Sequence, residues 1–219
     1  MRCTRGFWAV TGSLLAVALA GVGVFPGSTR AEAVVAPPRP GQVGVSVSGL
    51  YGTLLQTGDF GEAFTSGPGL AVRLRYRMRY ERGFGLTFEA HGLDPRSGFQ
   101  FVDLYTGMDV PADSSIAPKR LNLYLYGVDF YQMFGTRTKT TKMVSVGAGL
   151  AHPAFTTNNG DQQFVFGDGA YLSAGVGVER FFWQSMAFDF GARYQTVFLD
   201  GKVNHDLQAS VGLIFYASL

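Results

Sequence analysis

Cysteine, charge and long apolar runs are all scarce in this chain of 219 residues. Its only cysteine is Cys3, so disulfides, zinc–thiolate sites and cysteine nucleophiles are excluded from the rest of the sequence. Charged residues make up 16% of the chain and hydrophobic residues 47%, which argues against an ordinary soluble surface and against disorder. After residue 27 no uncharged apolar run approaches the roughly 18 residues of a spanning helix, so a helical membrane protein is excluded.

Residues 1–33 have the features of a cleaved secretory signal. A basic start precedes an uncharged apolar stretch at residues 6–25, and an A-x-A site ends at Ala33. We expect cleavage after Ala33; a cleavage site at residues 18–20 and an uncleaved membrane anchor are the alternatives.

The remaining chain is electrically neutral. The predicted signal holds three basic residues and one acidic residue, which leaves 15 of each beyond it. A neutral chain has no electrostatic footprint for nucleic acid, so no nucleic-acid partner is expected. Residues 34–41 contain three prolines and are predicted to form an extended periplasmic linker.

From Gln42 onward the hydrophobic period is two, which is typical of β-strands. The clearest segment is Val72–Tyr80, where apolar or aromatic side chains alternate with four arginines. As a strand this segment has one apolar and one cationic face, whereas a helix would scatter the arginines. The other predicted strands are Gln42–Thr53, Gly83–Leu93, Arg120–Phe134, Lys142–Ala151, Phe164–Arg180, Ser185–Phe198 and Asp206–Leu219.

The segment Arg120–Phe134 is the exception, because its two faces are both apolar. We assign its even-numbered face to the outside, since Gly127 and Asp129 then fall with the polar set.

The connections predict how these strands are arranged. Long connections at residues 54–68, 94–119 and 152–163 alternate with short ones at 81–83, 135–141 and 181–184. The prolines beyond the linker are placed at a strand edge or in these connections, as a closed sheet requires. Long loops at one end and short turns at the other are typical of an outer-membrane barrel. The predicted fold class is an all-β, eight-stranded, antiparallel up-and-down transmembrane β-barrel over residues 42–219.

The composition of the two faces separates this barrel from a soluble one. Glycine, serine, arginine and carboxylate side chains cannot line a pocket for a hydrophobic ligand, but they can fill a narrow lumen with hydrogen bonds and ion pairs. The opposite face of Val, Leu, Phe and Met would then contact lipid. Aromatic residues at the short-turn ends are expected to form an interfacial girdle: Tyr80, Phe84, Phe130, Tyr131, Phe134, Phe181, Phe182, Trp183 and Tyr216.

In this pattern the sequence resembles the small outer-membrane β-barrel family of the OmpA transmembrane-domain and OmpX type. The resemblance covers about Gln42 to Leu219 and includes the alternating run Ala187–Tyr194 and the C-terminal strand. It implies a Gram-negative-type outer membrane, with lipid and the barrel-assembly machinery as partners, the latter through the C-terminal strand. Family members usually end in an aromatic residue, whereas this chain ends in Leu219.

An eight-stranded barrel is just wide enough to be filled by its own side chains. We predict a self-neutralising network of ion pairs in the lumen, because isolated charges there would be costly. Its members are Arg73, Arg75, Arg77, Arg79, Glu89, Asp129, Glu179, Asp189 and Arg193.

The first short turn predicts which of these residues face each other. A three-residue loop at Glu81–Gly83 would place Arg75 opposite Glu89 and Arg77 opposite Thr87, with Gly83 at a positive φ.

The predicted function is a structural or interaction protein of the cell envelope, a plugged, porin-like barrel that presents surface loops. The alternatives are a lipid A-modifying barrel enzyme and a small ion-conducting pore. No catalytic, cofactor or metal residues are predicted, because the three histidines fall on non-adjacent strands without a nearby serine. An extracellular ligand or protein is expected at the second long loop, where the contact candidates are Phe99, Phe101, Tyr105 and Met108.

Overall fold

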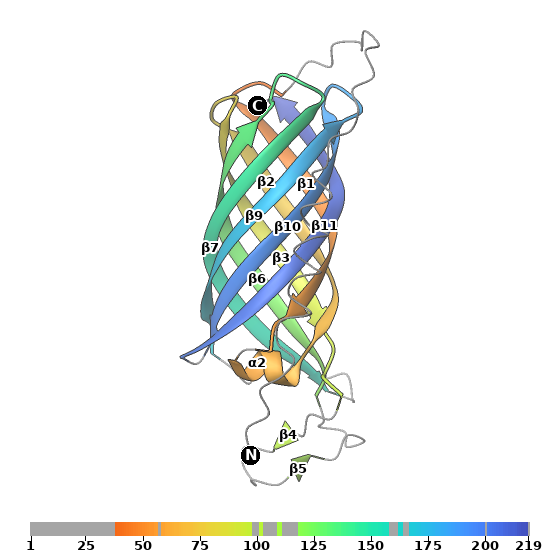
Figure 1. The fold of residues 1–219 in the computed structure, drawn as a ribbon, viewed down its shortest axis with the longest axis vertical. Helices are drawn as coiled ribbons and strands as arrows, with labels where there is room; N and C mark the ends of the chain where they lie inside the picture. Colours follow the sequence, from red (N-terminus) through yellow and green to blue (C-terminus); the bar gives the residue numbers. More distant parts are fainter. Residues whose placement is uncertain are drawn as a thin grey trace, which may run out of the picture. The chain divides into compact units, whose positions relative to one another are not determined.

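A computed structural model describes residues 38–56, 58–97, 101–102, 109–110, 118–157, 162–163, 167–199 and 201–218. The predicted signal at residues 1–33 and the first half of the predicted linker lie outside these residues. Within them, eight long strands form one closed, antiparallel barrel, as the sequence predicts (Figure 1).

The barrel follows the chain in order around its circumference. The strand order is β6-β3-β2-β1-β11-β10-β9-β7, and pairing between β6 and β7 closes the sheet. The short β8 continues the sheet beside the end of β7, and β4 pairs with β5. The elements are β1 (Gln42–Leu54), α2 (Gly58–Ala63), β2 (Ser66–Arg77), β3 (Arg82–Leu93), β4 (Phe101–Val102), β5 (Asp109–Val110), β6 (Pro118–Phe134), β7 (Thr140–Thr157), β8 (Gln162–Gln163), β9 (Gly169–Phe181), β10 (Met186–Leu199) and β11 (Lys202–Ser218).

Side chains alternate between the lumen and the outer surface along each long strand. In β2, for example, Val72 and Leu74 are exposed whereas Arg73 and Arg75 are buried. The outer surface is a continuous band of exposed apolar side chains, which a water-soluble barrel of this size would bury. In β6 the predicted facing is also found, with Val128 outside and the flanking odd positions inside.

The aromatic residues near the short turns divide between the two faces. Six of the predicted girdle residues are exposed, at 40–66% of their surface: Tyr80, Phe84, Phe130, Phe134, Phe182 and Trp183. The other three were assigned wrongly, because Tyr131, Phe181 and Tyr216 each retain only 2% exposure and occupy inward-facing positions. Their rings therefore help to fill the lumen instead of marking the membrane interface.

Several strand ends differ from those predicted. The second strand ends at Arg77 instead of Tyr80, and β11 begins at Lys202, so only a tight turn containing Gly201, with φ at 74°, separates it from β10. Pro118 and Pro153 lie in β6 and β7, not in connections. Pro153 is tolerated because the pairing of β7 with β9 ends at Ala151, leaving β6 as its partner at this position.

The two ends of the barrel are unlike. One end has the short turns between β2 and β3, β6 and β7, and β9 and β10, while helix α2 lies at the other end with the long loops (Figure 1). No helix among the described residues has the length and apolar character needed to cross a membrane.

Candidate functional site: the closed lumen

The lumen is built around a row of arginines on the inner face of β2. Arg73, Arg75 and Arg77 are 6%, 2% and 0% exposed. Because they are two residues apart in an extended strand, they point to the same side at successive depths. Each guanidinium contacts carboxylates carried by other strands, so the row is neutralised across the lumen.

The hairpin register between β2 and β3 differs from the predicted one. The turn comprises residues 78–81, and the backbone N–H of Arg79 donates to the carbonyl oxygen of Arg82 at 3.0 Å. Arg73 lies opposite Thr87, Arg75 opposite Gly85 and Arg77 opposite Gly83. The predicted facing survives because both registers keep the same parity, but the predicted cross-strand partners and the positive φ at Gly83 were wrong.

Arg79, predicted to be in the lumen, is therefore outside it. It lies in the turn and its side chain is exposed. The physical reason is that the strand ends at Arg77, three residues earlier than the alternation suggests, so the parity rule no longer applies at this position.

At the short-turn side of the polar layer, Glu179 of β9 binds two arginines. Its Oε2 accepts from Arg77 Nη2 at 2.8 Å, and its Oε1 pairs with Arg75 Nη1. The hydroxyl of Tyr216 also donates to Glu179 Oε1, at 2.6 Å. Arg75 Nη2 lies 3.5 Å from Asp189 Oδ2. The fully buried Glu179 carboxylate therefore accepts from three side chains of two other strands.

Glu89 of β3 is a second centre of the network. Its Oε1 accepts from Arg73 Nη2 at 2.7 Å and lies 3.4 Å from Arg193 Nη1. Gln195 Nε2 donates to the other oxygen, Oε2, at 2.9 Å. Glu89 is 0% exposed, so its charge depends on these donors.

Asp129 of β6 extends the network across the barrel. Its Oδ2 accepts from Arg193 Nη2 at 3.0 Å, from the hydroxyl of Tyr131 at 3.1 Å and from the hydroxyl of Thr87. The ring of Tyr131 also stacks against a guanidinium, with Arg75 Cζ 4.4 Å from its centroid. Arg193 therefore links Asp129 to Glu89.

A third polar group, which was not predicted from the sequence, is formed by His91, Asp206 and Gln208. Asp206 is 1% exposed, and its Oδ2 accepts from Gln208 Nε2 at 2.8 Å. The same amide nitrogen lies 3.0 Å from His91 Nε2. Asp206 has the parity of Gln208 in β11, so the alternation itself contained the signal. With Asp206 included, the described lumen holds four arginines, five carboxylates and one histidine.

Towards the long loops the filling changes from polar to apolar. Phe60 of helix α2 and Phe64 just after it are 6% and 1% exposed. Both rings stack on Phe155 of β7, with centroid separations of 6.5 and 5.5 Å. Arg96 Nη2 donates to the carbonyl oxygens of Gly61 and Phe64 at 3.1 and 3.3 Å. The segment is thereby held in the barrel mouth.

The strands supply an apolar lining for this cap from inward-facing positions. The lining includes Leu54, Leu93, Leu121, Leu123, Leu125, Ala151, Tyr171, Val197 and Leu199. These residues explain why both faces of the β6 sequence are apolar: the even positions contact the outside and the odd leucines fill the mouth.

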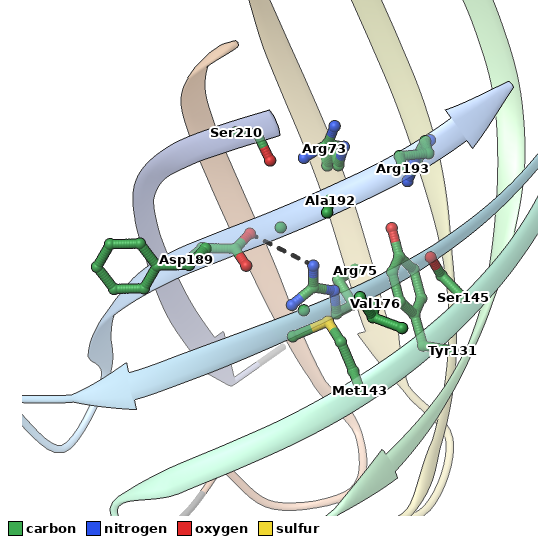
Figure 2. A pocket seen from close by; sticks show the side chains of 13 residues that line it. Arg73, Arg75, Tyr131, Met143, Ser145, Val176, Asp189, Ala192, Arg193 and Ser210 are labelled. Carbon is green, nitrogen blue, oxygen red and sulfur yellow. Dashed lines mark hydrogen bonds and ion pairs between the residues drawn. The ribbon is translucent and has the colours of Figure 1, made fainter. Parts of the chain in front are cut away.

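A small cavity of about 30 Å³ lies in the polar layer of the described lumen. It is lined in part by Arg73, Arg75 and Arg193, with Tyr131 and Asp189 beside them (Figure 2). This volume accommodates one or two water molecules.

The three histidines lie apart. His91 is in the lumen; His205 Nδ1 is 2.7 Å from the hydroxyl of Tyr194, and His152 pairs with Asp168. Among the described residues, no three His, Cys, Asp or Glu side chains are grouped as a metal site requires.

Three of the four predicted surface contacts lie outside the described residues. These are Phe99, Tyr105 and Met108. Phe101 begins β4, which pairs with β5 through Phe101 and Val110.

Comparison with known proteins identifies the fold. No protein-family model matches the sequence, and no curated protein matches it. Among solved structures, Neisserial surface protein A aligns with a TM-score of 0.60 at 13% identity, covering 79% of this chain and 96% of that protein. The outer membrane protein OprG from Pseudomonas aeruginosa aligns with a TM-score of 0.51 at 11% identity, covering 85% and 100%.

A third structure, of the outer membrane protein AlkL in lipid bilayers, has a TM-score of 0.51 at 12% identity and covers 90% of this chain and 97% of that one. At these identities the likeness concerns the fold alone. The chain has the fold of the small outer-membrane barrels, as its alternation pattern predicts.

Proposed function

We propose that this protein, which has the small outer-membrane barrel fold, is a closed structural or interaction protein of a Gram-negative-type outer membrane. The main observation in support of this proposal is the filled lumen, in which an ion-paired layer lies beneath an apolar cap. A barrel filled in this way has no aqueous path, so we expect it to present its loops instead of conducting ions. We propose no catalytic activity.

The charge distribution in the lumen supports a structural role for the network. Glu89, Asp129 and Glu179 each contact at least one arginine that is less than a tenth exposed. Such pairs cannot exchange readily with water, and separating them leaves an uncompensated buried charge. The network therefore favours one closed arrangement of the strands.

The orientation follows from the lengths of the connections. Short turns face the periplasm in barrels of this type, and long loops face the exterior. We place α2 and the second long loop at the cell surface, where Phe99, Phe101, Tyr105 and Met108 are candidate contacts for an extracellular ligand or protein. Export by a cleaved signal at residues 1–33 and assembly through the C-terminal strand belong to the same proposal.

Planar-bilayer recording of the purified full-length mature protein tests closure. We expect no steady conductance under conditions in which an open porin conducts. The Phe60→Ala, Phe64→Ala variant is expected to stay closed as well, because the ion-paired layer lies below the cap. A large, steady conductance of the unmodified protein would overturn the proposal.

Deletion of residues 100–117 tests the role of the loops. We expect the deletion variant to insert as an intact barrel and to lose binding to its extracellular ligand or protein. Unchanged surface binding and phenotype would contradict an interaction role for this loop.

A further inference from the structure

The short-turn end of the barrel carries a strongly basic set of side chains. Among the described residues, seven basic residues lie there, and Glu81 is the only exposed acidic residue at this end. They are Arg39, Arg79, Arg82, Arg137, Lys139, Lys142 and Arg180. Lys139 is half-buried and the other six are exposed.

The basic residues gather on one side of the barrel. Apart from Arg39, they belong to β3, β7, β9 or the turns next to them, and these strands are consecutive with β6 around the sheet. Arg82, Lys142 and Arg180 have the parity of the exposed apolar residues on their strands, so they point outward. These basic residues, called the basic patch below, therefore lie where the band of exposed apolar side chains ends, on the short-turn side.

The same side of the barrel bears an apolar groove. The groove has a volume of about 410 Å³ and lies between outward side chains of three neighbouring strands. These side chains are Phe84 of β3, Val128 and Phe130 of β6, and Val146 and Ala148 of β7. The groove is shallow and open to the outside of the barrel. Its lining is apolar, which favours a hydrocarbon occupant.

The groove and the basic patch lie on the same outer side of the barrel, and both include residues of β3 and β7. Arg82 lies two residues from Phe84 along β3, and Lys142 lies four residues from Val146 along β7. At about 3.3 Å per residue, the charged groups begin about 7 to 13 Å from the groove, towards the short turns. Phe134, which is opposite Lys142, adds an exposed aromatic ring at the interface.

We propose that this side of the barrel is a binding site for an anionic phospholipid of the periplasmic leaflet. One acyl chain lies in the groove, and the phosphate contacts Arg82 and Lys142, with Arg180 beside them. Arginine and lysine bind phosphate by charge-assisted hydrogen bonds, and basic residues near a membrane surface attract anionic lipids. The proposal depends on the membrane-spanning orientation proposed above.

Quenching of a tryptophan by brominated lipids measures the preference of the proposed site for an anionic phospholipid over a zwitterionic one. Trp183 is the single tryptophan once the predicted signal is removed, so Phe134→Trp in a Trp183→Phe background places the reporter opposite Lys142. The mature protein is inserted into phosphatidylcholine vesicles containing brominated phosphatidylglycerol or brominated phosphatidylcholine. We expect a preference for phosphatidylglycerol of at least about five-fold, the factor that one basic residue near an anionic surface supplies.

Two variants in the reporter background remove the two halves of the site. Arg82→Gln, Lys142→Gln, Arg180→Gln is expected to reduce the preference to about one, because the headgroup contacts are lost. Ala148→Phe fills the groove and is expected to weaken the preference at least two-fold with the cations in place.

The matched controls are Lys119→Gln, Arg120→Gln at the opposite end and Ala209→Phe on the outer face of β11. Lys119, Arg120 and Ala209 are exposed, and both control variants are expected to keep the full preference.

The outcomes separate this site from the general proposal. Equal quenching by the two lipids, or a preference that survives the triple substitution, overturns the site. A preference unaffected by Ala148→Phe also overturns it, because bare charge attraction needs no groove. Absence of quenching by either lipid shows instead that the barrel is not embedded in the bilayer, which contradicts the proposed function.

Discussion

Removing the Glu89 carboxylate tests the ion-paired lumen most directly. In Glu89→Ala, Arg73 loses the carboxylate that lies 2.7 Å away, and Arg193 loses one of its two carboxylate contacts. Gln195 also loses its acceptor at 2.9 Å. Since Arg73 is only 6% exposed, its charge would be left without a close counter-ion and shielded from bulk water. Breaking a buried pair in this way lowers the free energy of unfolding by about 3–5 kcal/mol.

Urea titration of the mature barrel in lipid vesicles measures this loss. Trp183 fluorescence reports unfolding, and heat-modifiable migration on gels reports the folded fraction. Asp94→Ala is the matched control, because it removes an ion pair with Arg120 at 3.3 Å whose side chains are 46% and 56% exposed. Exposed pairs contribute at most about 1 kcal/mol.

A second variant separates loss of the pair from loss of volume. Arg73→Met, Glu89→Met removes both charges and keeps apolar bulk, so it is expected to cost less than Glu89→Ala alone. If Glu89→Ala and Asp94→Ala shift the unfolding free energy equally, the buried network does not stabilise the barrel as argued.

Three further predictions concern the backbone, the cap and processing. Gly149→Ala should abolish refolding, measured as the heat-modifiable fraction on gels, because a Cβ there would lie 2.0 Å from a backbone oxygen. Gly49→Ala, whose Cβ would be 4.0 Å from the nearest atom, should refold normally. Equal refolded fractions of the two variants would refute the close approach. Phe64→Ala should lower the unfolding free energy by about 3–5 kcal/mol in urea titration, whereas an unchanged value would show that the cap does not pack in the mouth. Mass spectrometry of the exported protein should find Val34 as its first residue, and retention of the apolar segment would favour the uncleaved anchor.

The facing of side chains was predictable from the sequence because parity is a local property of an extended chain. Arg73, Glu89, Glu179 and Asp189 all point into the lumen, and each lies on a strand with an alternating pattern. The prediction fails where the strand ends: Arg79 has the right parity but lies in a turn. Strand ends depend on the backbone hydrogen bonds of the turn, which alternation does not encode.

Pairing across the lumen was decided by the tertiary structure. Arg75 contacts Glu179, which is 104 residues away in sequence, instead of the predicted Glu89. Its cross-strand neighbour is Gly85, which has no side chain to engage the guanidinium. Which carboxylate then comes within reach depends on the stagger of eight strands around a closed sheet, and no local signal contains that stagger.

The sequence alone predicts a β-barrel with an apolar exterior, a polar lumen, and long and short connections at opposite ends. Three features follow only from the folded barrel: Phe60 and Phe64 cap the mouth, Asp206 joins the lumen, and the groove beside Phe84 lies next to the basic patch. The period of two fixes the side to which a residue points. Closure of the sheet fixes the depth at which it lies and the strands beside it, and these set its contacts.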